Sequence, residues 1–274
     1  MKNILVVDNH PMMLKFMTDL LVKKGHQVKT AEDGLGALDV LKTYTPDVVF
    51  TDLIMPNIDG EKLCRIIRGM PELKDAYLII VSSIAADEEL DYTKLGANAL
   101  IAKGPFDKMA QHITDVLDQL DLEITRDMPG KLIGKEDAFE REIAKELLTS
   151  KRHIEVILKN ISEGVLDLTI EGQIVYANAF AVFLIGIPEE ELLGSNFIDL
   201  FSEGDREVIK NLLEQSGILP RTISKDSPMI LNGKHVSISI FPVTEKDQKS
   251  FVVILTNVSE LVRLKAKLKE AQNK

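Results

Sequence analysis

The first half of the chain alternates short, wholly apolar runs with amphipathic stretches. An apolar run of this kind predicts a strand that is buried on both faces. Apolar residues spaced three and four apart in the intervening stretches predict helices. Together they indicate an α/β fold, a doubly wound parallel sheet of five strands with helices on both sides. The expected strands are residues 4–7, 28–30, 48–51, 78–81 and 99–102, and the expected helices are residues 12–24, 34–44, 60–69, 87–95 and 106–120.

This pattern stops after residue 123, and Met128-Pro129-Gly130 is typical of a domain boundary. Residues 124–160 are predicted to be a linker that contains a long polar helix over residues 135–160. The apolar residues of this helix recur at spacings of four and three, as in a coiled-coil seam, with Ser150 filling one slot as a weak point. The seam residues are Ile143, Leu147, Ile154, Ile157 and Ile161.

The second half predicts an α+β domain with a five-stranded antiparallel sheet and helices on one face. Glu171-Gly172 and Asn232-Gly233 are hairpin turn signals between apolar runs. The final helix, residues 259–274, carries a second seam of Leu261, Leu264, Leu268 and Ala271. The expected strands are residues 164–170, 173–177, 228–231, 235–241 and 251–257, and the expected helical pieces are residues 178–186, 189–193 and 205–214.

Composition narrows the class of protein. The 274 residues carry 33 basic and 43 acidic side chains, a net charge of -10, which weighs against a nucleic-acid-binding face. The lone cysteine, Cys64, excludes an intramolecular disulfide and any multi-cysteine metal site. No signal-peptide pattern and no membrane-length apolar run are seen, so a cytoplasmic protein without membrane contact is expected.

Candidate chemistry lies at the ends of the predicted parallel strands, where ligands bind in open α/β sheets. The strands of the first half end at Asp8-Asn9, at Asp52, at Ser82-Ser83 and at Lys103. Carboxylates can hold Mg²⁺ or accept a phosphoryl group, and a hydroxyl and an ammonium suit the phosphoryl oxygens. The plainer alternative is that an Asp at a strand end only caps the following helix.

Four stretches in the first half resemble the receiver domain of two-component response regulators: residues 4–9, 52–60, 81–83 and 102–106. The resemblance covers residues 1–123. It implies that Asp52 is the phosphoacceptor, that Ser82 is the hydroxyl switch and that Lys103 is the phosphate partner. The Mg²⁺ site it implies consists of Asp8, Asn9, Asp52 and the backbone carbonyl of Ile54.

Three positions depart from the usual receiver pattern. Asn9 stands where a second acid is usual, so we expect weaker Mg²⁺ binding but not its loss. Leu100 replaces an aromatic residue that rotates in many receivers, so an aromatic rotamer switch is excluded. Gly104 separates Lys103 from Pro105, which changes the loop after the lysine.

Residues 161–258 resemble a PAS domain, through residues 161–166, 172–180, 190–194 and 197–201. Cys64 lies in the other domain, which excludes a cysteine-adduct flavin sensor. His153 and His235 lie outside the helical pieces expected to carry a haem ligand. No PAS ligand is named by the sequence, and dimerisation without a ligand is an open alternative. Asn257-Val258-Ser259 stands where PAS domains often have Asp-x-Thr, and Ser259 also suits the N-cap of the final helix.

The combined expectation is a signalling protein, without enzymatic output of its own, in which a partner histidine kinase or phosphotransfer protein phosphorylates Asp52. The linker helix would pass the change to a PAS module that senses or dimerises. The two seams predict a parallel homodimer, with a monomer whose helices fold onto their own PAS domain as the alternative. Two further alternatives are the regulatory part of a larger histidine kinase or nucleotide cyclase, and a phosphorylation-independent scaffold.

Overall fold

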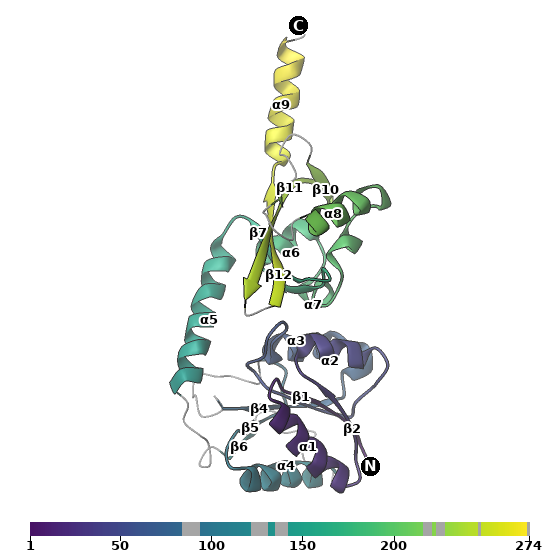
Figure 1. Ribbon diagram of the computed structural model, residues 1–274, viewed down its shortest axis with the longest axis vertical. Helices are drawn as coiled ribbons and strands as arrows, with labels where there is room; N and C mark the ends of the chain where they lie inside the picture. The colour runs from purple at the N-terminus through teal and green to yellow at the C-terminus, as the bar shows by residue number, and fades with distance from the viewer. Residues whose placement is uncertain are drawn as a thin grey trace. The chain divides into compact units, whose positions relative to one another are not determined.

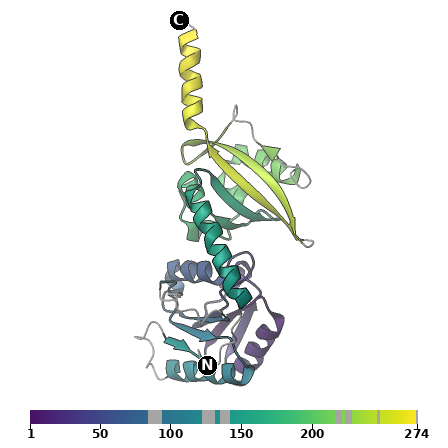
Figure 2. The same ribbon diagram turned by 90° about the vertical axis from the view of Figure 1, so that its left-hand side faces the viewer.

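The computed structural model describes residues 1–83, 94–121, 131–134, 142–215, 221–222, 228–245 and 248–272. The chain divides into two compact units, Met1–Lys151 and Arg152–Lys274, and Figures 1 and 2 label or colour the elements of each. Within the described residues, no helix combines the length and the apolar character needed to cross a membrane.

The first unit is a parallel sheet with the strand order β2-β1-β3-β4-β5-β6. Helices α1 and α4 cover one face of the sheet, and α2 and α3 cover the other (Figure 1). This confirms the doubly wound architecture, while the predicted helix at residues 87–95 falls mostly outside the described residues. The strands are β1 (Asn3–Val7), β2 (Gln27–Ala31), β3 (Val48–Thr51), β4 (Tyr77–Ser82), β5 (Ala99–Ala102) and β6 (Lys131–Ile133), and the helices are α1 (Pro11–Lys23), α2 (Gly34–Leu41), α3 (Gly60–Gly69), the 3-10 turn η1 (Pro71–Leu73) and α4 (Phe106–Asp121).

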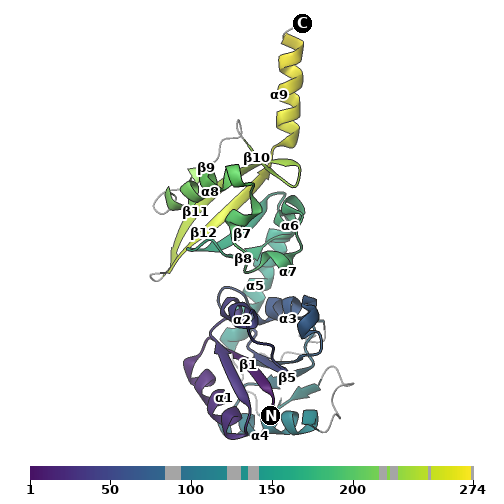
Figure 3. The same ribbon diagram turned by 90° about the vertical axis from the view of Figure 1, so that its right-hand side faces the viewer.

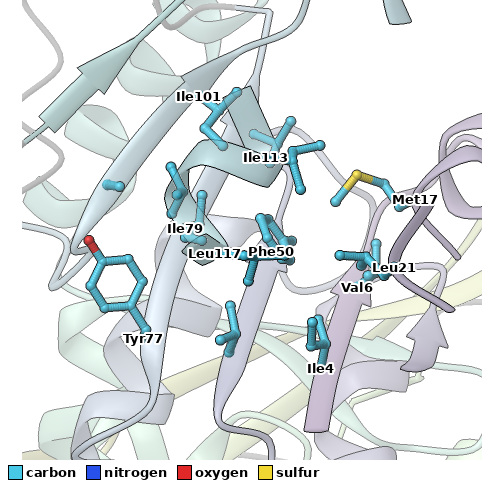
Figure 4. Close-up of a cluster of buried hydrophobic side chains, with 14 of the residues drawn as sticks. Ile4, Val6, Met17, Leu21, Phe50, Tyr77, Ile79, Ile101, Ile113 and Leu117 are labelled. Atoms are coloured by element: carbon cyan, nitrogen blue, oxygen red, sulfur yellow. The ribbon is translucent and has the colours of Figure 1, made fainter. Parts of the chain in front are cut away.

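The apolar strand runs form the core because both faces of the sheet are covered. Residues Ile4 to Val7 of β1 are all buried, and alternate side chains point to opposite faces. On the α1 and α4 face, Phe50 and Ile79 from the sheet pack with Met17 and Ile113 from the helices (Figure 4). The sheet is thereby fixed between its two layers of helices.

Strand β6 is a difference from the predicted five-stranded sheet. It lies within the stretch predicted to be linker and pairs in parallel with β5, with Leu100 opposite Leu132. Only three residues form the strand, and a run this short carries no recognisable period. The stretch predicted to be linker therefore contributes an edge strand to the parallel sheet before α5 begins.

The second unit is an antiparallel sheet with the strand path β10-β11-β12-β7-β8, and β9 pairs with β11 off this path. Asn232 and Gly233 have φ values of 46° and 70°, as a type I′ hairpin turn between β10 and β11 requires. Helices α6, α7 and α8 pack on one side of the sheet (Figure 3). The elements are β7 (Gly164–Thr169), β8 (Ile174–Ala177), α6 (Ala179–Ile185), α7 (Glu189–Leu192), the 3-10 turn η3 (Phe197–Leu200), α8 (Glu203–Gln215), β9 (Arg221–Thr222), β10 (Met229–Leu231), β11 (Lys234–Glu245) and β12 (Gln248–Asn257).

Two helices flank this sheet in the sequence: α5 (Glu142–Asn160) and α9 (Ser259–Gln272). The first seven residues of the predicted linker helix, 135–141, lie outside the described residues. Large apolar side chains on both helices are exposed in the single chain. These are Ile154, Val156 and Ile157 on α5, and Leu261, Leu264 and Leu268 on α9.

Candidate functional site

The predicted site residues come together at the carboxyl edge of the parallel sheet. Asp8 follows β1 directly and Asp52 follows β3, and these two strands pair with Val7 opposite Thr51. Ser82 ends β4 and Lys103 follows β5, which pair with Ser82 opposite Ala102. Because parallel strands end at the same edge of the sheet, these polar side chains lie close together at its carboxyl edge.

Lys103 joins the two carboxylates. Its Nζ lies 2.6 Å from Oδ2 of Asp8 and 2.7 Å from Oδ2 of Asp52. The Asp8 and Asp52 residues are only 2% and 8% exposed, and the lysine side chain is 16% exposed. One ammonium group therefore bridges two buried carboxylates that come from strands far apart in the sequence.

The remaining carboxylate oxygens are held by backbone amides. Oδ1 of Asp8 accepts a hydrogen bond from the His10 N–H at 2.8 Å, and Oδ1 of Asp52 accepts one from the Leu53 N–H at 2.7 Å. Burial raises the pKa of Asp52, and Asp8 raises it further, while Lys103 and the Leu53 amide act in the opposite direction. Both carboxylates are thus fixed in orientation before any ligand arrives.

Three further predicted residues surround this centre. Ser82 is fully buried, and its backbone carbonyl accepts a hydrogen bond from the Lys103 N–H at 2.9 Å. Ile54 is half-buried in the loop after β3, and Asn9 is exposed next to Asp8. The individual roles that the resemblance implies for these residues stay predictions.

The donor set fits a hard cation. Mg²⁺ prefers oxygen ligands and keeps several waters, so it needs few protein groups. The carboxylates of Asp8 and Asp52 both approach the same nitrogen within 2.7 Å, so two oxygen-bearing groups of the right type lie at one place. The amide oxygen of Asn9 and the carbonyl of Ile54 belong to the same two strand-end loops as these carboxylates.

Asp59 and Gly60 support the loop that follows Asp52. Oδ1 of Asp59 accepts a hydrogen bond from the Lys62 N–H at 2.9 Å, which caps the N-terminus of α3. A Cβ at Gly60 would collide with the backbone carbonyl oxygen of Asp52. Asp59 also makes an ion pair with Lys151 of α5. No sequence signal relates these two residues, because they are 92 positions apart.

The second unit has its own buried polar centre at Asn178. Its side-chain oxygen accepts hydrogen bonds from the Val165 and Ala181 amides, and its side-chain nitrogen donates to the carbonyls of Leu158 and Glu163, each at 2.9 Å. All four hydrogen-bonding positions of the amide are therefore used. The residue joins the last turn of α5 to β7 and to the start of α6.

The Ser259 hydroxyl, at the start of α9, makes a different hydrogen bond from the helix cap that the sequence predicts. The predicted capping hydroxyl of Ser259 accepts a hydrogen bond from the His235 N–H of β11 at 2.9 Å. Oδ1 of Asn257 accepts one from the Ser259 N–H at 3.0 Å. The hydroxyl therefore ties the start of α9 to the sheet.

Two protein families match the chain. Residues 4–114 match the response regulator receiver domain, and residues 152–256 match the PAS fold. The chemotaxis protein CheY of Halobacterium salinarum is 32% identical over 123 residues, which cover 42% of this chain and 97% of that protein. The sensor histidine kinase RcsC of Escherichia coli K12 is 36% identical over 100 residues, or 36% of this chain. The aligned part spans only 10% of the length of RcsC.

Solved structures of receivers also match the first unit. The chemotaxis response regulator CheY4 of Vibrio cholerae is 22% identical, with a TM-score of 0.40, and the match covers 44% of this chain and 98% of that one. The response regulator TrrA of Thermotoga maritima, solved in complex with Mg²⁺ and BeF, is 29% identical with a TM-score of 0.37, and the match covers 42% of this chain and 99% of that one. The chain belongs to the response regulators of two-component signalling, with a receiver domain followed by a PAS domain.

Proposed function

We propose that Asp52 accepts a phosphoryl group from a phosphohistidine of a partner histidine kinase or phosphotransfer protein. The observation that carries the proposal is the position of Lys103, whose Nζ contacts both Asp8 and Asp52 at the edge of the sheet. A lysine that only balanced surface charge would not need two buried carboxylates as partners. Sensor histidine kinases among the relatives agree with this class of phosphoryl donor.

In the proposed transfer, an Asp52 carboxylate oxygen forms a bond to phosphorus while the bond from phosphorus to the donor imidazole nitrogen breaks. The electron pair of the broken bond stays with the imidazole nitrogen. The ammonium of Lys103 lies where the phosphoryl oxygens arrive, so it offsets their charge. The Ser82 hydroxyl, at the end of the neighbouring strand, is the proposed hydrogen-bond partner of the phosphoryl group.

Receivers of this family use Mg²⁺, and we propose that Asp8, Asn9, Asp52 and the Ile54 carbonyl hold it here. The ion would supply neutralisation of the charge on the transferring group. Asp8 and Asp52 provide the carboxylate oxygens, and the hydrogen bonds to His10 N–H and Leu53 N–H keep them oriented.

We further propose that the chain has no enzymatic output within these residues and that it works in the cytoplasm as a parallel homodimer. Exposed leucines on α9 at spacings of three and four support the dimer. The PAS domain would then act as a sensor or hold the dimer together.

The proposal is tested with acetyl phosphate and Mg²⁺ on the full chain, followed by intact-mass measurement. We expect the wild type to gain one phosphoryl group and the Asp52→Asn variant to gain none. Asp19→Asn, at an aspartate on α1, is the matched control and is expected to behave as the wild type. A wild type that gains no phosphoryl group, or an Asp52→Asn variant that still gains one, would overturn the proposal.

A further inference from the structure

An ion pair connects the linker helix to the loop that follows Asp52. Nζ of Lys151, on α5, lies 2.6 Å from Oδ2 of Asp59. The Asp59 side chain is 9% exposed and the lysine side chain is 37% exposed. The carboxylate of this ion pair is therefore buried, and dissolved salt screens the attraction between the two charges less than it would at an exposed site.

Asp59 is coupled to the phosphoacceptor through the backbone. The Gly60 N–H donates to the Leu53 carbonyl at 3.2 Å, and a side chain at Gly60 would collide with the Asp52 carbonyl. The two ends of the loop that contains Ile54 are therefore packed against each other. A shift of this loop on phosphorylation would move the Asp59 carboxylate, because the carboxylate sits at the end of the loop and caps α3.

Lys151 is the closer of the two lysines that the structure pairs with this carboxylate. Nζ of Lys62 lies 3.8 Å from the same oxygen, against 2.6 Å for Lys151. Burial alone would raise the pKa of Asp59, but Lys151 first and Lys62 second outweigh it and lower that pKa. Asp59 is therefore a charged anchor for the helix.

We infer that Lys151 and Asp59 form a latch that couples the phosphorylation state of Asp52 to the docking of the first part of α5, residues 142–151, within the receiver unit. The inference rests on the proposed function of Asp52. This coupling requires no rotating aromatic side chain, because the loop after Asp52 contacts α5 through the ion pair between Asp59 and Lys151. By linkage, if phosphorylation weakens the latch, loss of the latch favours the phosphorylated state by the same free energy; if phosphorylation strengthens the latch, its loss disfavours that state.

The first arm of the test needs no phosphorylation. Hydrogen exchange is measured on the full-length wild type and on Lys151→Gln, with Lys159→Gln as the control because Lys159 is an exposed lysine of the same helix. We expect faster exchange in residues 53–60 and in α5 for Lys151→Gln and no change for Lys159→Gln. Equal exchange in the wild type and both variants would overturn the latch itself.

The second arm measures the lifetime of phosphorylated Asp52 after acetyl phosphate is removed. We expect Lys151→Gln to change the half-life by about fivefold, which corresponds to about 1 kcal/mol in the barrier to hydrolysis. The Asp59→Asn variant should change it in the same direction, and the double variant should add little to either single change. An unchanged half-life in a variant with faster exchange would overturn the coupling. A wild type that takes up no phosphoryl group would instead overturn the proposed function, and the exchange arm separates these two failures.

Discussion

At the scale of single residues, Lys103 decides the electrostatics of the receiver pocket. Two carboxylates that are at most 8% exposed share this one ammonium at 2.6 and 2.7 Å. Without the lysine, two buried negative charges would face each other, so one of them would have to take up a proton or rebuild its solvation.

We expect Lys103→Met to lower the free energy of unfolding by about 3 kcal/mol at pH 7, the lower range for removing one partner of a buried ion pair. Urea denaturation measures this, and Lys108→Met on the exposed side of α4 is the control. Addition of Mg²⁺ should restore part of the loss, because the cation replaces the missing positive charge. A Lys103→Met variant as stable as the control would contradict this account of the pocket.

Asn9 supplies a second residue-scale prediction. It is exposed next to Asp8, at a position where a carboxylate would add a negative charge to the proposed metal site. Asn9→Asp should therefore bind Mg²⁺ more tightly than the wild type, by about tenfold if the gain is ~1.4 kcal/mol. A Mg²⁺ titration followed by calorimetry measures the two affinities, and equal values would contradict the prediction.

The pKa of Asp59 gives a pH-dependent prediction. It lies below the ordinary value of 3.8, so the charged form favours the folded state. The stabilisation is present above pH 3.8 and is lost as the pH falls through the lower folded-state pKa. Asp59→Asn, which retains the cap of α3, should be less stable than the wild type near neutral pH. The difference should close in acid, as urea denaturation at a series of pH values would show; a constant difference would contradict it.

At the scale of elements, Asn178 is the place where three elements of the PAS unit meet. Asn178→Asp keeps the oxygen that accepts from Val165 and Ala181 but removes both donors to the carbonyls of Leu158 and Glu163. We expect the free energy of unfolding to fall by about 2 kcal/mol or more, since two buried carbonyls lose a partner.

Part of that loss should return in acid, because a protonated Asp can donate one hydrogen bond. Guanidinium denaturation at neutral and acidic pH measures both effects. As a control, Asn211→Asp changes an exposed asparagine on α8 in the same way. Equal stability of Asn178→Asp and the control would show that the amide donors do not matter.

Strands β3 and β6 show which elements the hydrophobic pattern of the sequence predicts and which it does not. The strand over residues 48–51 was predicted with its observed bounds, because a buried parallel strand is apolar at every position. Because this strand lies inside the parallel sheet, Asp52 at its end lies next to Lys103, as the prediction of a shared carboxyl edge requires. Strand β6 was not predicted, because three residues show no period and its pairing depends on β5. The Lys151 and Asp59 pair was not predicted either, since only the fold brings residues 92 positions apart together.

At the scale of the whole molecule, the exposed leucines of α9 bear on assembly. Leu264 and Leu268 are 56% and 62% exposed, which leaves a large apolar surface on this helix. Leu264→Asp should shift the protein from dimer to monomer, because a charge in a coiled-coil seam has no favourable partner. Sedimentation at several concentrations measures this, and Lys269→Asp, at an exposed lysine of the same helix outside the seam, is the control. A wild type that is monomeric at all concentrations would contradict the proposed homodimer.

The edge strand β6 has a further consequence for how copies of this chain can associate. An exposed edge strand has unpaired backbone N–H and C=O groups that can pair with a strand of another chain. Very short edge strands reduce this pairing. Among the described strands of the receiver, β6 covers β5 and itself offers only three residues to a newcomer. The linker therefore reduces this edge of the receiver sheet to three residues, which disfavours strand pairing with another copy along this edge.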